Sequence, residues 1–146
     1  MNNYRAGFLA NGEPAPLRPE IFRAPPQSQP TIAEALSAKG ITWKWYSGGR
    51  TAGGVTSEEY CGVCDPLTYS SAIMTGPLKA NLQDHAALFR DIDDIYAMPA
   101  LAFVIPPNTE SGHPASSTVS RYEAFLRKLI DKVRSNPSCG RSRRSW

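Results

Sequence analysis

The clearest pattern of apolar and polar positions lies near the C-terminus. Over residues 118–135, apolar side chains recur three and four positions apart, at Tyr122, Phe125, Leu126, Leu129, Ile130 and Val133. This spacing is typical of one face of an amphipathic helix, and charged residues fill the opposite side. We therefore predict a helix that packs one stripe on a sheet, with Ser120 and Glu123 as its capping pair.

Two shorter segments have strand patterns. Residues 41–46, ITWKWY, alternate apolar and polar positions, which predicts a strand that buries Ile41, Trp43 and Trp45 on one face. Residues 100–105, ALAFVI, are a continuous apolar run closed by two prolines, which favours a strand buried on both faces of a parallel sheet. A buried strand, a loop and an amphipathic helix in sequence are one half of a βαβ unit. The predicted fold class is α/β.

Two further helices are expected. Thr31 and Glu34 fit a capping box, and Gly40 suits a left-handed C-terminal residue, so residues 31–39 should form a short helix. Residues 77–92 have apolar positions at roughly helical spacing and predict a surface helix. Six of the 13 prolines precede residue 31, so the N-terminal segment should be mostly extended or loop.

Composition and charge narrow the class of protein. With 146 residues, 41% hydrophobic and 20% charged, the chain is long enough for one globular core. The net charge of +3 arises in residues 138–146, which hold three arginines and no acid, so residues 1–137 carry 16 − 3 = 13 basic and 13 acidic side chains. A neutral body gives no electrostatic footprint for nucleic acid. No run reaches the roughly 18 apolar residues of a transmembrane helix, and the N-terminus lacks a hydrophobic export signal, so localisation stays undecided.

Three cysteines, Cys61, Cys64 and Cys139, do not make a disulfide framework. The Cys61 to Cys64 spacing fits half a zinc site or a redox pair, but zinc needs a second pair of ligands. Asp65-Pro66 follows directly, where a thioredoxin-like motif would open a helix. Two loop cysteines are the simpler interpretation, and the sequence leaves open whether they pair.

Several blocks of the chain resemble one family. Residues 25–49 (PPQSQPTIAEALSAKGITWKWYSGG) and 101–137 look like internal blocks of the bacterial phosphoesterases that include phospholipases C and an acid phosphatase. Residues 64–92 resemble the stretch that links them. The combination is specific: KGITW, then Trp45-Tyr46, then Gly-His-Pro at residues 112–114 after an apolar strand.

The resemblance implies a partial alkaline-phosphatase-like fold, with an incomplete sheet flanked by helices. It implies hydrolysis of phosphate esters, including phospholipids, in the complete enzyme, with a divalent metal assisting attack by a hydroxyl nucleophile. Family members are often exported. The nucleophile and the acidic metal-binding motif lie in parts of the family that this sequence does not match. His113 is therefore the one catalytic position carried over, as a contact to the substrate phosphate or the leaving group; we predict no cofactor in this chain.

The resemblance also divides the chain. We expect an irregular segment at residues 1–24, a partial phosphoesterase domain at 25–137 and a basic tail at 138–146. Family members continue after Asn-Pro with Glu-Leu-Trp-Lys, and loss of one G from CCG GAG CTG TGG AAG gives codons for Pro-Ser-Cys-Gly, as in residues 137–140. A frameshift would thus place the tail out of frame, and we expect the chain to be catalytically inactive.

Other side chains have plainer interpretations. His113 by itself fits an exposed loop histidine, and His85, beside Asp84 on a predicted helix, fits a solvated one. The aromatic residues of segment 41–46 are typical of strand packing, although they also suit an aromatic rim for a choline-like group. The alternative function is a non-catalytic module that holds an anionic partner through this aromatic strand and the basic tail.

Overall fold

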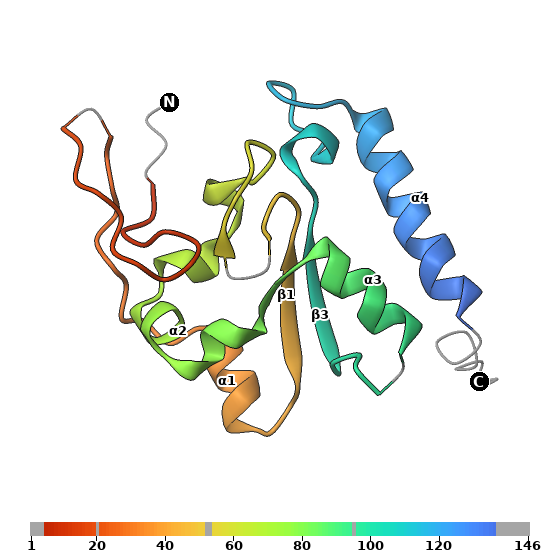
Figure 1. Cartoon of the computed structure of the whole chain (residues 1–146), viewed down its shortest axis with the longest axis horizontal. Helices are drawn as coiled ribbons and strands as arrows, with labels where there is room; N and C mark the ends of the chain where they lie inside the picture. Colours follow the sequence, from red (N-terminus) through yellow and green to blue (C-terminus); the bar gives the residue numbers. More distant parts are fainter. Residues whose placement is uncertain (1–4, 20, 52–53, 95, 137–146) are drawn as a thin grey trace.

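A three-stranded parallel sheet organises the protein (Figure 1). The computed structural model describes residues 5–19, 21–51, 54–94 and 96–136. Its strands are β1 (Trp43–Ser47), β2 (Leu82–Asp84) and β3 (Leu101–Ile105), in the order β2-β1-β3. The predicted α/β class is confirmed as a small parallel sheet packed against helices.

The register brings the ends of the strands together. Ser47, the last residue of β1, pairs with Asp84 of β2 and with Ile105 of β3. All three strands therefore end at one edge of the sheet, and the segments that follow them begin side by side. In α/β proteins this edge is where ligands bind.

Helices cover both faces of the sheet. They are α1 (Ile32–Ala38), α2 (Ser71–Thr75), α3 (His85–Asp93) and α4 (Val119–Ser135). Short 3-10 helices occur at Gly62–Cys64, Pro66–Tyr69, Pro77–Asn81 and Asn108–Glu110. One core cluster joins Trp43 and Trp45 to α1 and α2, and the other joins Tyr46 to α3.

The capping box of α1 is confirmed. The Thr31 hydroxyl accepts from the backbone N–H of Glu34, and the Glu34 carboxylate accepts from the backbone N–H of Thr31 at 2.8 Å. Gly40 follows with φ of +68°, the left-handed conformation that the sequence predicted.

The prediction that β1 buries a single face is wrong. Tyr46, on the face expected to be polar, is 0% exposed, because α3 packs there with Leu88 and Ile92. The Tyr46 hydroxyl donates to Asp91 of α3 at 2.6 Å, and Lys44 forms an ion pair with the same carboxylate. The polar groups of this face are thus satisfied by the helix that covers it.

The single surface helix predicted for residues 77–92 is also wrong. Pro77–Asn81 is a 3-10 helix, β2 follows at Leu82–Asp84, and only then does α3 begin. Two contacts explain this division: Leu82 pairs with Trp45 of the distant strand β1, and Asp84 caps α3 by accepting from the backbone N–H of Ala87 at 2.6 Å.

Both C-terminal elements form where the sequence placed them, but with different burial. Strand β3 is half-buried rather than enclosed on two faces, because β1 is the central strand. On α4 Phe125 is buried and Tyr122 and Ile130 are exposed, so the packed stripe is narrower than predicted. Thr118, not the pair Ser120 and Glu123, caps α4, because its hydroxyl accepts from the backbone N–H of Arg121.

The N-terminal segment is irregular, as its prolines predict, but it is well packed. Isolated bridges join Arg5 to Arg23 and Phe8 to Pro14. The backbone carbonyl of Ala10 accepts from Arg50 at 2.6 Å, and that of Asn11 accepts from Lys79 at 3.0 Å. The segment thus supplies backbone acceptors for two cationic side chains, Arg50 and Lys79, in the rest of the fold.

Candidate functional site

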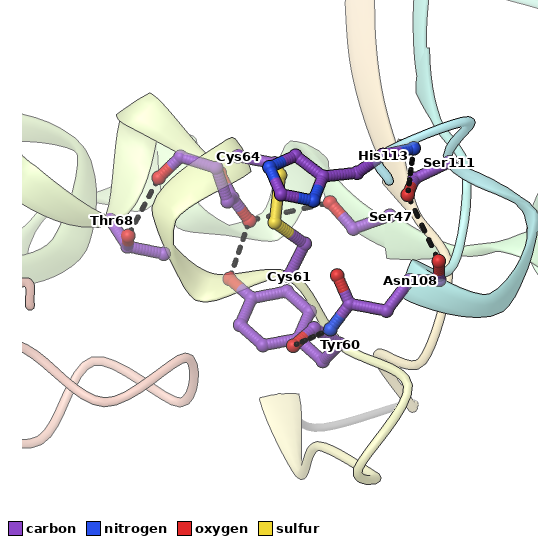
Figure 2. Close-up of a disulfide and its surroundings, with 9 residues drawn as sticks. Ser47, Tyr60, Cys61, Cys64, Thr68, Asn108, Ser111 and His113 are labelled. Carbon is purple, nitrogen blue, oxygen red and sulfur yellow. Dashed lines mark hydrogen bonds between the residues drawn. A yellow bond between two sulfur atoms is a disulfide. The ribbon is translucent and has the colours of Figure 1, made fainter. Parts of the chain in front are cut away.

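A cleft of about 370 Å³ opens at the carboxyl edge of the sheet. One wall is the loop after β3, the other is the segment around the Gly62–Cys64 3-10 helix, and Arg5 contributes from the N-terminal segment. Figure 2 shows several of the side chains that meet there, among them Tyr60, Asn108 and His113. The cleft is lined by Arg5, Tyr60, Cys61, Gly62, Val63, Cys64, Asn108, Ser111, His113 and Ser116.

His113 lies in this cleft with an exposed ring. Its Nδ1 accepts from the backbone N–H of Ala115 at 3.2 Å, and its own backbone N–H donates to the Ser111 hydroxyl at 3.2 Å. With Nδ1 as an acceptor, the neutral ring carries its proton on Nε2. The neutral ring can thus donate a hydrogen bond to an oxygen of a bound ligand, and the protonated ring can give up a proton.

Close backbone contacts hold the two walls together. The backbone N–H of Asn108 donates to the carbonyl of Glu59 at 2.8 Å. The backbone N–H of Gly48 donates to the carbonyl of Ile105 at 2.9 Å and joins the ends of β1 and β3. A Cβ on Gly48 would lie 2.3 Å from the backbone nitrogen of Pro107, so only glycine fits this position. The glycines after β1 therefore permit a tight junction between the loops.

A buried polar cluster lies behind the cleft. Asp65, 0% exposed, accepts at Oδ2 from the hydroxyl of Tyr60 at 2.7 Å and from that of Ser47 at 3.3 Å. The guanidinium of Arg50, 5% exposed, lies 3.4 Å from the same oxygen. Asp65 Oδ1 and Arg50 Nε have no partner among the described residues. Asp65 thereby connects the end of β1 to the Tyr60 wall.

Burial is the main cause of the shifted pKa values in this cluster. It raises the pKa of the Asp65 carboxyl above its ordinary value, against the opposing effects of the Tyr60 hydrogen bond and the Arg50 charge. Burial also raises the pKa of the Tyr60 hydroxyl, and the neighbouring Asp65 charge raises it further. Tyr60 therefore remains a hydrogen-bond donor to Asp65.

Cys61 and Cys64, whose pairing the sequence left open, form a disulfide in the wall of the cleft. Figure 2 shows the disulfide among Tyr60, Asn108 and His113. Cys61 precedes the short 3-10 helix and Cys64 is its last residue, with Tyr60 before the pair and Asp65 after it. The disulfide thus borders the candidate site.

His85 is not the solvated side chain that the sequence predicted. It is half-buried, its Nε2 lies 2.9 Å from the carbonyl oxygen of Ile105, and its ring stacks on Phe125 of α4. Burial lowers the pKa of His85 below its ordinary value, although the hydrogen bond to Ile105 opposes this. The residue links α3, β3 and α4 by packing.

The aromatic strand packs in the core, as the simpler interpretation predicted. Trp43, Trp45 and Tyr46 are all buried, and Trp43 Nε1 donates to the Ser37 hydroxyl at 2.8 Å. They cannot form an exposed rim for a ligand. The other half of the alternative binding module, the basic tail at 138–146, lies outside the described residues.

The described residues contain no group of three or more His, Cys, Asp or Glu side chains placed to hold a metal ion. Asp65, which follows Cys64 of the cleft directly, is fully buried and its Oδ2 already accepts from Tyr60 and Ser47. This donor set does not fit the divalent metal that the resemblance implies for the complete enzyme. None of the described helices is both long and apolar enough to cross a membrane.

Sequence reasoning found His113 but missed its neighbours. Asn108 and Ser111 lie in the same loop, and this proximity in sequence was a usable signal. Tyr60 and Arg5 reach the cleft from distant parts of the chain, and no local pattern marks them.

The parallel sheet, with a cleft where its strands end, defines an α/β protein whose candidate ligand site lies at the carboxyl edge of the sheet. The model of the Phosphoesterase family matches residues 4–142, so the chain belongs to the phosphoesterase family. The match includes residues on both sides of the 25–137 segment. A comparison with curated proteins gave no match. Family membership makes a phosphate ester the substrate class.

Proposed function

We propose that the chain supplies the His113 loop of a centre that hydrolyses phosphate esters, of the phospholipase C or acid phosphatase type. One observation carries the proposal: His113 lies in a cleft at the carboxyl edge of the parallel sheet of a phosphoesterase. Its Nε2–H can donate a hydrogen bond to a phosphate oxygen, and the doubly protonated ring can give a proton to a leaving alkoxide and return to the neutral form. Arg5 adds positive charge to the same cleft.

The narrower choice of type rests on the sequence blocks. KGITW with Trp45-Tyr46, followed by Gly112-His113-Pro114, resembles phospholipases C and an acid phosphatase in combination. The proposed role of His113 is to orient the phosphate and to protonate the leaving oxygen. The proposed arrangement is a partial catalytic domain at 25–137, preceded by the irregular segment.

We further propose that this chain alone does not turn over substrate, since its described residues bring together neither metal-ligating side chains nor the family nucleophile. The test uses p-nitrophenyl phosphate and p-nitrophenylphosphorylcholine with added Mg²⁺ or Zn²⁺. The expected result is release of nitrophenol at the buffer rate. Release above that rate would overturn the proposed inactivity.

Binding tests the role of His113 separately. Titration with inorganic phosphate should shift the backbone NMR signals of Asn108, Ser111 and His113. His113→Ala should weaken this binding by about 2–10-fold, the value of one hydrogen bond. His113→Gln, which keeps an N–H donor, should weaken it less. Unchanged affinity in His113→Ala would remove His113 from the phosphate site.

A further inference from the structure

The Cys61–Cys64 disulfide forms part of the cleft wall, and the role proposed for His113 does not use it. Cys64 is exposed, Cys61 is half-buried, and both line the His113 cleft. A sulfur atom at an open surface can be reached by a thiol from solution. The position of this disulfide allows exchange, whereas one buried in the core would exclude it.

The fold does not depend on this link. The two cysteines are three positions apart, so the disulfide closes a very short loop and restricts the unfolded chain far less than a long-range bridge does. Other contacts hold the same segment: the Tyr60 hydroxyl donates to Asp65 at 2.7 Å, and the backbone N–H of Cys64 donates to the carbonyl of Cys61 at 3.0 Å. Two free thiols would therefore stay adjacent and ready to pair again.

The charges around the disulfide favour an anionic thiol. The cleft lining includes the Arg5 guanidinium, and no carboxylate is among the described residues that line it. Asp65 follows Cys64 directly, but it is fully buried and lies against Arg50. The Arg5 charge attracts a negatively charged reactant and stabilises a departing thiolate.

From these observations we propose that Cys61–Cys64 is a reversible redox site, reduced from the cleft by a small anionic thiol such as glutathione. The thiolate of a first molecule attacks Cys64 Sγ, the Cys61–Cys64 bond breaks, and Cys61 leaves as a thiolate that takes a proton from water. The thiolate of a second molecule attacks the sulfur of the first, and Cys64 leaves and is protonated. Two small thiols are oxidised to one disulfide, and one protein disulfide is reduced to two thiols.

The first experiment counts thiols in the folded full-length chain. A Cys139→Ser variant removes the third cysteine, and the protein is equilibrated with mixtures of reduced and oxidised glutathione, quenched and alkylated for mass spectrometry. In oxidised glutathione we expect no alkylated cysteine. In mixtures of reduced and oxidised glutathione within the range that cells maintain, we expect two alkylated cysteines, which appear together. Return to oxidised glutathione should restore zero adducts.

Two results would overturn the proposal. One is a folded protein that gains no adduct in a large excess of reduced glutathione, while the urea-unfolded chain gains two, which would make the disulfide purely structural. The other is two adducts before any reductant is added, which would mean that the cysteines do not pair.

The second experiment tests the route through the cleft. Arg5→Gln should slow reduction by glutathione about threefold, in line with loss of one nearby charge, and leave the rate with uncharged β-mercaptoethanol unchanged. Arg18→Gln is the matched control, because Arg18 is exposed, lies in the same N-terminal segment and does not line the cleft. Equal rates for the two variants with glutathione would overturn the cleft route.

Discussion

At the scale of single residues, Asp65 has the most contacts to lose. Its carboxylate accepts from Tyr60 and Ser47 and neutralises Arg50, and the side chains of this ion pair are 2% and 0% exposed. Asp65→Ala would leave the Arg50 charge buried without a counter-ion. We expect the free energy of unfolding to fall by about 3–5 kcal/mol, measured by urea denaturation.

The control for this prediction is the ion pair between Lys132 and Asp93, whose aspartate is largely exposed. Asp93→Ala should change the free energy of unfolding by less than about 0.5 kcal/mol, as for most surface ion pairs. Similar losses in Asp65→Ala and Asp93→Ala would show that the Asp65 cluster contributes little.

His85 should make stability depend on pH. Its pKa in the folded protein is lowered from the ordinary value of 6.5, so below that pH the unfolded chain takes up the proton first. The free energy of unfolding should therefore decrease as the pH falls through the window between 6.5 and the lower folded pKa. Urea denaturation at several pH values measures this decrease.

The comparison with His85→Gln isolates this effect. Glutamine keeps an N–H donor for the carbonyl oxygen of Ile105 but does not titrate. The raised pKa of Asp65 acts in the opposite direction, making the folded protein less stable as the pH rises, but it is present in both proteins and cancels in their difference. Parallel pH profiles for the wild type and His85→Gln would contradict the assignment.

At the scale of elements, the capping box of α1 offers a defined test. Thr31→Ala removes the oxygen that accepts from the Glu34 backbone and one partner of the Glu34 carboxylate. We expect a loss of about 1 kcal/mol in the free energy of unfolding. Thr31→Ser keeps the hydroxyl and should lose only a few tenths of that, and a loss as large as that of Thr31→Ala would assign the effect to the missing methyl group.

Local signals explain which elements were predicted correctly. Helix α1 has a capping box and a C-terminal glycine, and α4 has a long periodic pattern, so neither needs tertiary information. Segment 77–92 misled because its division depends on the pairing of Leu82 with Trp45, 37 positions earlier in the sequence. The same limit applies to Tyr46, since no local pattern shows that α3 covers its face.

For the candidate site, too, residues marked by local sequence signals were predicted and those brought in by long-range contacts were not. His113 was found from a motif and from its position after a strand, both of which are local. Arg5 and Tyr60 were missed because the approach of three separate segments brings them to the cleft. The Cys61–Cys64 spacing raised the possibility of a pair, but only the geometry of the 3-10 helix places both sulfurs within bonding distance.

At the scale of the whole molecule, the N-terminal segment is predicted to be part of one cooperative unit with the sheet. Removal of residues 1–24 would take away the Ala10 carbonyl that accepts from the buried Arg50 guanidinium and the Asn11 carbonyl that accepts from Lys79. A buried charged donor left without its acceptor costs about 1.5–3 kcal/mol or more. For a chain of this size, we expect Tm to fall by roughly 5–15 °C.

The matched control leaves the segment in place and changes an exposed position within it. Leu17 is 93% exposed, so Leu17→Ala should leave Tm unchanged. If the truncated chain melts at the temperature of the full chain, residues 25–137 are stable without the segment and the Ala10 to Arg50 bond has no role in the fold. A lower Tm in a single transition would instead extend the folded unit to the N-terminal segment, because the partners of Arg50 and the lining of the cleft both include residues before position 25.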